Sequence, residues 1–301
     1  MPPALLRVPA SSANLGPGFD TLGLALDLYL DCRITPAPQL SIHAQGRDAA
    51  AIDCTATNLI WATACSVAAS AGRNLPCIHL EITNAIPLGK GLGSSAAALT
   101  AGVVIADHLL NLSWSRQRIL DEAARLEGHP DNVAACVLGG IVASGLDQSG
   151  AAHAVRLSLP PSIGIAVLVP DFALPTHQAR AVLPDCYSRE DAIFNIQRTA
   201  LLLAALAVGD LSVFPFALED RLHQPYRQAL VPGLAEALAL RLPGLLGCAL
   251  SGAGPSVLIF HESARPDVPA QVAAHFCGDV RQCEVLVRAV AEQGYTLRAV
   301  E

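Results

Sequence analysis

Two hydrophobic patterns alternate along the first half of the chain. Short stretches in which apolar and polar residues alternate predict β-strands. Longer apolar runs that carry start and stop signals predict α-helices. The predicted strands are residues 5–10, 22–34, 39–46 and 77–84, and the predicted helices are residues 58–71, 95–112 and 116–126. The patterns therefore predict a fold that mixes α-helices and β-strands.

The second half continues the mixture after a proline pair. Pro160-Pro161 is the predicted domain boundary, which divides the chain into residues 1–159 and 160–301. Shortly before it, Gly139-Gly140 and Ser144-Gly145 predict turns on either side of a short strand, residues 141–143. After it we predict a strand at 163–169, a helix at 189–208, and a tail from 268 of one or two helices and a strand at 295–300.

Composition narrows the class of protein. The chain has 301 residues, of which 52% are hydrophobic and 15% charged, so it can bury a substantial core. Its net charge is −7 and Lys90 is its single lysine, which disfavours nucleic-acid binding. The start of the chain lacks the basic and apolar regions of a signal peptide, and the most apolar windows, 96–112 and 200–208, are interrupted or too short to span a membrane. We therefore expect a cytoplasmic protein without a membrane segment, whose nine cysteines are reduced because no C-x-x-C pair occurs.

The most informative stretch is IPLGKGLGSSAAALT, residues 86–100. Three glycines alternate with other residues, and two serines then open an alanine-rich helix. Glycines let backbone N–H groups converge, and a helix N-terminus adds a positive dipole end, so this pattern predicts an anion site. An ordinary loop before a capped helix is the alternative. The spacing matches neither the Walker A nor the Rossmann glycine motif.

Three further turns contain residues that could bind a ligand or take part in catalysis. SSANLGPGFD, residues 11–20, contains Asn14 and Asp20, whose simplest role is to stabilise the turn. LEGHPDNVA, residues 126–134, places Glu127 and Asp131 close together. Two carboxylates after a phosphate loop suit Mg²⁺, although Asp131 would equally cap the following helix. ALSGAGPSV, residues 249–257, is a second glycine loop, for which a tight connection between elements is the alternative.

Residues 87–97 resemble the P-x-G-x-GLGSSAA loop of the GHMP kinases, a superfamily of small-molecule kinases. VPASSANLGPGFDTLGLAL and EGHPDN resemble the homoserine kinase form, and THQARAVLP and HQPYR extend the similarity over most of the chain. The resemblance implies an α+β fold with an N-terminal ribosomal-S5-like ATP-binding domain and a C-terminal ferredoxin-like domain. It also implies Mg²⁺-dependent transfer of the γ-phosphoryl group of ATP to the hydroxyl of L-homoserine.

The same resemblance implies the roles of individual residues. The nucleotide would lie on Pro87, Leu88, Gly89, Lys90, Gly91, Leu92, Gly93, Ser94, Ser95, Ala96 and Ala97, and Mg²⁺ on Ser95 and Glu127. Catalysis would involve Asp131 together with Ser95 and Glu127. The substrate would contact Asn14, Asp20, His129, Asp131, Asn132, Arg198, Arg227 and Gly252.

Charge balance suggests how a zwitterionic substrate would be held. Arg198 stands in an apolar helix, where a buried guanidinium needs an anion, so we assign it to the carboxylate together with Arg227. Asp20 and Asn14 would face the ammonium or hydroxyl end. Asp131 is the best candidate for a general base, and substrate binding alone is its alternative role.

Three alternatives stay open at this stage. A mevalonate or sugar kinase of the same superfamily would share the motifs, although mevalonate has no ammonium group for Asp20 to meet. A non-catalytic ligand sensor would share the fold, but it would not need to keep Ser95, Glu127 and Asp131. A homodimer is a candidate assembly.

Overall fold

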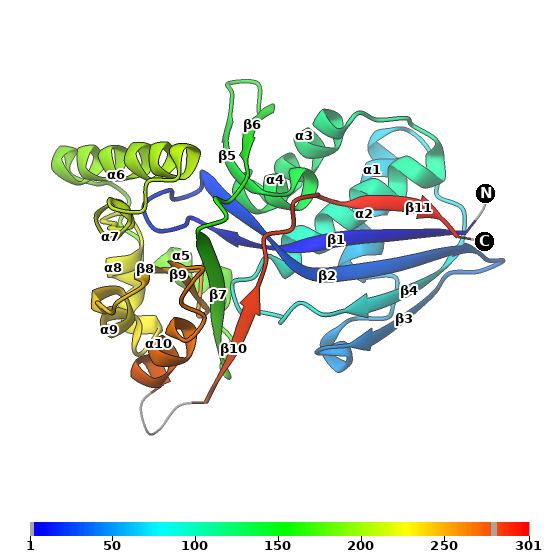
Figure 1. Ribbon diagram of the computed structural model, residues 1–301. Coiled ribbons are helices and arrows are strands. Elements are labelled where there is room, and N and C mark those ends of the chain that lie inside the picture. The colour runs from blue at the N-terminus through cyan, green and yellow to red at the C-terminus, as the bar shows by residue number, and fades with distance from the viewer. Residues whose placement is uncertain (1–2, 278–281, 301) are drawn as a thin grey trace.

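The computed structural model describes residues 3–277 and 282–300, which form two β-sheets with helices packed on them (Figure 1). The first sheet contains β1 (Ala4–Ala13), β2 (Leu22–Pro36), β3 (Ser41–Gly46), β4 (Ile78–Asn84), β5 (Ile141–Leu146), β6 (Ala152–Leu157) and β11 (Thr296–Ala299). Its order is β11-β1-β2-β4-β3, and β5 joins β2 to β6. Only β3 and β4 pair in parallel. The predicted strands of the first half are therefore confirmed, and β1 extends to Ala13.

Four helices belong to the first unit: α1 (Leu59–Ser70), α2 (Ser94–Leu110), α3 (Arg116–Glu127) and α4 (Asp131–Leu138). Their starts follow from the sequence. Asn58 caps α1 by accepting bonds from the N–H groups of Ile60 and Trp61, and Ser115 caps α3 by accepting from Arg118. The small, apolar residues of α2 are almost all buried, because this helix packs on β1 and is covered by α1 and α3. The predicted helices agree with these bounds within two residues.

The second unit has the strand order of a ferredoxin-like fold. Along the chain it contains β7 (Ile163–Pro170), α6 (Arg189–Val208), β8 (Leu245–Leu250), β9 (Val257–Glu262), α10 (Val268–Cys277) and β10 (Cys283–Arg288). Shorter helices lie between them: α5 (Thr176–Ala181), α7 (Phe214–Ala217), α8 (Gln224–Arg227) and α9 (Leu234–Ala239), with a single 3₁₀ turn at Gln228–Leu230. A further 3₁₀ turn, Ala49–Ala51, lies in the first unit between β3 and α1. The sheet order is β10-β7-β9-β8, all antiparallel, so the four strands stand as fourth, first, third and second. The predicted α+β fold with a ferredoxin-like second unit is confirmed.

The side chains of β7 point alternately to the two faces of the second sheet, and both faces are covered. Ile165 and Val167 belong to a core cluster that also contains Leu202 of α6 and continues into the first unit. Ala166 and Leu168 point the other way, into a second cluster with residues of α9 and α10. The two units therefore share one continuous apolar core, although the sheets change between β6 and β7, where the proline pair predicts the boundary.

The structure corrects the prediction for the tail. Of the one or two predicted helices, the described residues of the tail contain one, α10, and Cys283–Arg288 is an unpredicted strand, β10, which pairs with β7. The final predicted strand is confirmed as β11, but it returns to the first sheet and pairs with β1. Cys277 and Cys283 form a disulfide, so the expectation that all cysteines are reduced is wrong for this pair.

A second correction concerns the hairpin after α4. Ser144 and Gly145 lie inside β5 rather than in a turn, and the chain reverses at Asp147 instead. The Asp147 carboxylate accepts bonds from the N–H groups of Ser149 and Ala151, which closes the turn before β6. Strand β6 was not predicted, because its outward residues leave only a weak apolar pattern.

Candidate active site

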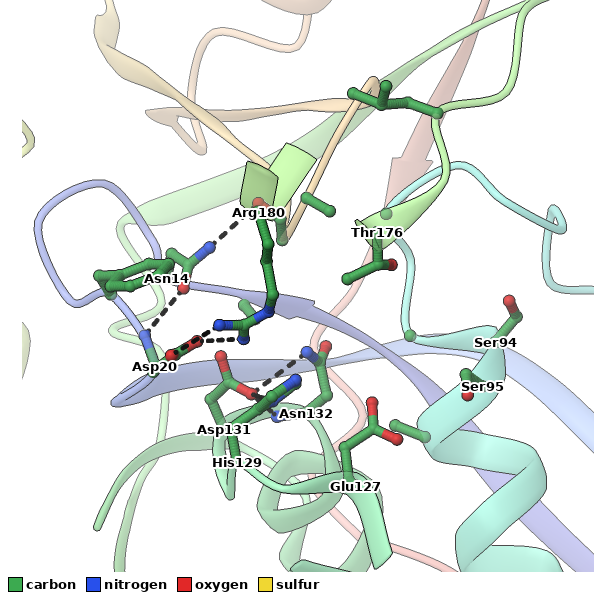
Figure 2. A pocket seen from close by; sticks show the side chains of 18 of the residues that line it. Asn14, Asp20, Ser94, Ser95, Glu127, His129, Asp131, Asn132, Thr176 and Arg180 are labelled. Carbon is green, nitrogen blue, oxygen red and sulfur yellow. Dashed lines mark hydrogen bonds and ion pairs between the residues drawn. The ribbon is translucent and has the colours of Figure 1, made fainter. Parts of the chain in front are cut away.

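The motifs predicted from sequence meet at one cavity between the two units (Figure 2). Fourteen predicted site residues line it: Asn14, Asp20, Gly89, Gly91, Gly93, Ser94, Ser95, Ala96, Glu127, His129, Asp131, Asn132, Arg227 and Gly252. Leu174, Thr176, Arg180 and Ala253 of the second unit and Ala13 and Phe19 of the first complete the lining. Side chains of both units therefore face the same space.

The two glycine loops interlock because their backbones approach very closely. Gly91 has a φ of +76°, and a Cβ atom there would lie 2.3 Å from the carbonyl oxygen of Ser251. The Ser251 hydroxyl donates to the Gly91 carbonyl at 2.7 Å. Gly93 approaches the segment of residues 11–20 just as closely, since a Cβ atom there would lie 1.9 Å from Oγ of Ser11. Only glycine fits at both positions, so the alternation of glycines in this loop has a packing cause.

The loop ends at the N-terminus of α2, which begins at Ser94. Gly93 stands at the cap position in the left-handed conformation and offers no side chain to the helix. The N–H groups of a first helical turn have no partner within the helix, so those at Ser94, Ser95 and Ala96 are donors for an anion. Figure 2 shows both serines at the start of this helix, beside the cavity.

Glu127 faces these serines across the cavity (Figure 2). It is the last residue of α3, and Gly128 in the left-handed conformation then turns the chain toward His129. Burial raises the pKa of the Glu127 carboxyl, against the lowering effect of His129. Within residues 3–277 and 282–300, no hydrogen bond or ion pair engages this carboxylate. A partly desolvated carboxylate without a partner is chemically suited to a hard divalent cation.

A polar cluster follows at the start of α4. Oδ1 of the buried Asp131 accepts from the backbone N–H of Asn132 at 2.6 Å and from its side-chain amide at 3.2 Å, and it lies 2.9 Å from Nδ1 of His129. Burial lowers the pKa of His129, but the hydrogen bond and charge of Asp131, with Asp20 and Glu127, outweigh it and raise the pKa overall. All these bonds fall on one oxygen, so Oδ2 of Asp131 is left to meet a ligand.

Asp20 is held by an arginine that the sequence analysis did not assign. Arg180 of α5 donates to both carboxylate oxygens of Asp20, at 2.8 and 3.2 Å (Figure 2). Asn14 fixes the turn on the other side, because its Oδ1 accepts from the N–H of Asp20 and its amide donates to the carbonyl of Gly252. The segment THQARAVLP contains Arg180 and was the signal that could have identified it.

Arg227 enters the cavity from the second unit and is almost fully buried, at 2% exposure. Its guanidinium donates to the carbonyls of Ala179 and Gly252 at 3.0 and 3.1 Å. A third bond, at 3.2 Å, joins it to Nδ1 of His223, whose pKa is lowered by burial and which is therefore neutral. Burial, and after it the charge of Arg180, lowers the pKa of Arg227 to about 10, so it stays protonated at neutral pH.

Arg198 does not reach this cavity, which corrects its predicted place beside Arg227. Its guanidinium lies 3.7 Å from the ring centroids of both Phe194 and Phe216 and is 3.0 Å from the carboxylate of Glu219. The argument that a buried guanidinium needs an anion was sound, but the anion is a side chain of the same unit.

Five residues of the predicted nucleotide loop also do not line the cavity. Nζ of Lys90 donates to the carbonyl of Pro170 at 2.8 Å and so points to the second unit. Pro87, Leu92 and Ala97 are buried in the packing around the loop. Leu88 instead lines a second, more apolar cavity of about 380 Å³, together with Ile52, Asn58, Leu59 and Ala98. Ser94 and Ser95 border both cavities, so the two spaces meet at the N-terminus of α2.

The acidic and imidazole side chains of Asp20, His129 and Asp131 could also surround a cation, since their ligand atoms all lie within 4.8 Å of one another. Arg180 already holds both carboxylate oxygens of Asp20, however, and Nδ1 of His129 and Oδ1 of Asp131 are bonded to each other, which leaves Oδ2 of Asp131 as the unengaged carboxylate oxygen of this group. Glu127 has no such partner and is the stronger metal-ligand candidate.

Comparisons with known proteins agree with this geometry. Residues 58–140 match the N-terminal domain of the GHMP kinases. The chain is 63% identical to a homoserine kinase of Solibacter usitatus, over 97% of this chain and 96% of that protein, and 49% identical to one of Deinococcus radiodurans, over 86% and 85%. Among solved structures, a homoserine kinase from Cytophaga hutchinsonii superposes with a TM-score of 0.86 at 27% identity, covering 99% of this chain and 98% of that one. A galactokinase from Lactococcus lactis shares the fold at 15% identity, with a TM-score of 0.70.

High identity to curated relatives over almost the full chain, a GHMP kinase N-terminal domain and the converging motifs around one cavity together show that this chain belongs to the homoserine kinase family.

Proposed function

We propose that the protein transfers the γ-phosphoryl group of ATP to the side-chain hydroxyl of L-homoserine, which yields O-phospho-L-homoserine and ADP. The observation that carries the proposal is the meeting of a glycine-loop helix terminus, a partnerless carboxylate and two arginines in one cavity. Phosphoryl transfer needs positioning and charge neutralisation more than covalent help, and these groups provide both.

The two joined cavities suit the two ends of ATP. The apolar space beside Leu88 and Leu59 would hold the adenine ring, and its volume lies in the range of ligand pockets. The triphosphate would then extend along the N-terminus of α2, where the helix dipole and free N–H groups favour negative charge. The γ-phosphoryl group would thereby reach the cavity that contains Asp131.

Ser95 and Glu127 would hold Mg²⁺ between the phosphates and α3. The Ser95 hydroxyl and the Glu127 carboxylate are oxygen ligands, which this cation prefers. The cation would neutralise phosphate charge when bound. The chain's own contribution is to leave the Glu127 carboxylate without another partner and to aim it at the start of α2.

The substrate carboxylate would bind Arg227, with Arg180 at the other side of the cavity mouth. Arg180 replaces Arg198 in this assignment, because Arg198 is engaged by Glu219. Asp20 would stay close to Arg180 and offer its second face to the ammonium group, while Asn14 and Gly252 hold the neighbouring turn. A zwitterion would then find both signs of charge in one half of the cavity.

Asp131 would accept the proton of the attacking hydroxyl at Oδ2, because its Oδ1 is occupied by Asn132 and His129. The hydroxyl oxygen forms the new bond to phosphorus, the bond from phosphorus to the bridging oxygen of ADP breaks, and ADP takes that electron pair. His129, whose Nδ1 lies 2.9 Å from Oδ1 of Asp131, would hold the carboxylate with Oδ2 toward the hydroxyl.

A substrate panel tests the proposal. ATP consumption is measured with homoserine, mevalonate, galactose and shikimate offered separately, and the product is identified by phosphorus NMR. We expect turnover with homoserine and the spectrum of O-phosphohomoserine. Turnover of mevalonate without homoserine would reject this substrate, and no turnover of any alcohol would favour the sensor alternative. A cytoplasmic location, the absence of membrane and nucleic-acid partners, and a homodimer stay predictions.

A further inference from the structure

Among the described residues that line the cavity between the two units, Phe19 is the one with a phenyl ring. The centroid of this ring lies 5.7 Å from the guanidinium carbon of Arg180 and 5.4 Å from that of Arg227. Arg180 belongs to α5 and Arg227 to α8, so two arginines from different helices meet at one ring. The face of an aromatic ring attracts a guanidinium group within about 6 Å of its centroid.

The imidazole of His223 supports the ring of Phe19. The two rings stack, with their centroids 5.3 Å apart and their planes at 22°. His223 is fully buried, and both of its nitrogens are engaged. Because a guanidinium can only donate, Nδ1 accepts from Arg227, and Nε2 therefore carries the hydrogen that it donates to the carbonyl of Gly16 at 2.7 Å. The imidazole is held in one orientation, so the ring that stacks on it has a fixed support.

The backbone on both sides of the phenyl ring is also anchored. The carbonyl of Pro17, two positions earlier, accepts from the side chains of Asn195 at 2.9 Å and Thr199 at 3.0 Å, both on α6. The N–H of Asp20, one position later, donates to the side chain of Asn14 at 3.0 Å. The fold therefore sets the position of the ring without the help of a bound substrate.

The two guanidinium groups differ in their partners. Arg180 forms an ion pair with Asp20, whereas Arg227 bonds to two carbonyls and a neutral imidazole. In the part of the chain that the structure describes, no carboxylate lies within ion-pair distance of Arg227. The charge of Arg180 also acts against that of Arg227 and contributes to its lowered pKa. The ring of Phe19 thus lies where its negative face offsets the repulsion between two like charges.

We propose that Phe19 is a positioning residue for the substrate carboxylate: its ring fixes the guanidinium groups of Arg180 and Arg227 so that their N–H groups converge on one ligand. This inference rests on the proposed function, because it requires a substrate that carries a carboxylate. The ring forms no hydrogen bond with either arginine, so it holds them without using the donors that the substrate needs. An aliphatic side chain of similar size would fill the same space but would attract neither guanidinium.

Steady-state kinetics of Phe19→Leu test this role. We expect the KM for homoserine to rise roughly tenfold, which corresponds to about 1.4 kcal/mol, while the KM for ATP stays close to wild type. Phe194→Leu is the matched control, because the ring of Phe194 also contacts two arginines, Arg198 at 3.7 Å and Arg221 at 4.0 Å, but does not line the cavity. It should leave both KM values near wild type. An unchanged KM for homoserine in Phe19→Leu, or an equal rise in Phe194→Leu, would overturn the proposal.

A substrate without a carboxylate separates positioning from simple packing. 3-Aminopropan-1-ol is homoserine that lacks this group, so it gains nothing from the arginines. The ratio of kcat/KM for homoserine to kcat/KM for the amino alcohol should therefore fall about tenfold in Phe19→Leu. An equal loss with both substrates would show that Phe19 only fills space and would reject its positioning role.

Pentafluorophenylalanine at position 19 tests the electrostatic part of the argument. It keeps the shape of the ring but reverses the charge of its face, so it should raise the KM for homoserine as Phe19→Leu does, and it serves as the test if the leucine variant does not fold. A wild-type KM in this variant would overturn the proposal. Wild-type protein that does not phosphorylate homoserine would reject the proposed function itself, whereas normal wild-type turnover with an unchanged substrate ratio in both variants would reject the role of Phe19 alone.

Discussion

Replacement of Gly91 by alanine should damage the contact between the two glycine loops more than backbone strain alone explains. The added methyl group would lie 2.3 Å from the Ser251 carbonyl oxygen and 2.8 Å from that of Gly254. Both atoms belong to the backbone, so no side chain can rotate away and the loops themselves must separate. The substitution therefore tests whether the close approach of these loops matters to stability and activity.

The expected loss in the free energy of unfolding has two contributions. The left-handed backbone of Gly91 costs an alanine about 1–2 kcal/mol, and overpacking adds about 1–3 kcal/mol. Gly72 is a matched control, because its φ is +65° and an added Cβ there has no atom within 4 Å. Gly72→Ala should therefore lower the free energy of unfolding by the strain alone, and Gly91→Ala by about 1–3 kcal/mol more.

Urea unfolding followed by circular dichroism measures this difference. Steady-state kinetics of the same two variants add the functional consequence, since a loop displaced by about 1 Å can cost roughly a hundredfold in rate. We expect kcat/KM for ATP to fall on the order of tenfold or more in Gly91→Ala and to stay close to wild type in Gly72→Ala. Equal stability and equal kinetics of the two variants would refute the argument that the loop approach requires glycine.

Arg227→Ala should raise the KM for homoserine about tenfold to a hundredfold with little change in the KM for ATP, since a bond to a charged group contributes about 1.5–3 kcal/mol. Arg198→Ala, measured in the same assay, should lower the melting temperature and leave that KM near wild type. Because burial raises the pKa of Glu127, the apparent affinity for Mg²⁺, measured from the rate at varied Mg²⁺, should weaken as pH falls through that raised pKa. Glu127→Gln should lower kcat roughly a hundredfold or more. His129 has a raised pKa in the fold, so its charged form stabilises the protein below about pH 6.5 and this contribution is lost as pH rises through the folded-state pKa. The free energy of unfolding of His129→Gln, measured in urea, should accordingly depend less on pH across that window than that of the wild type. An unchanged pH dependence would remove Asp131 as the stabilising partner.

The local sequence pattern was sufficient to predict an element where residues within it or next to it determine its structure. The helix at Arg189–Val208 was predicted with its bounds, because Ser188 caps it and Gly209 ends it. The glycine loop that leads into α2 was also predictable, since its glycines and serines act over ten residues. Strand β10 was not, because Cys283–Arg288 becomes a strand by pairing with β7 far earlier in the chain.

The choice between two arginines shows a second limit of the sequence. Arg198 was assigned to the site because a guanidinium in an apolar helix needs an anion, and the structure supplies one in Glu219. Arg180 stands in a segment with the family pattern, yet its partner Asp20 is 160 positions away along the chain. Charge arguments identify which side chains need a partner, whereas only the tertiary fold determines which partner each one meets.

The return of β11 to the first sheet has a consequence for synthesis on the ribosome. One edge of β1 stays without its neighbour until residues 296–299 have been made, because β11 supplies that pairing. An unpaired strand edge is prone to join other chains. The nascent first unit therefore emerges with an open edge, and it can complete its sheet only after the entire second unit has followed it out of the ribosome.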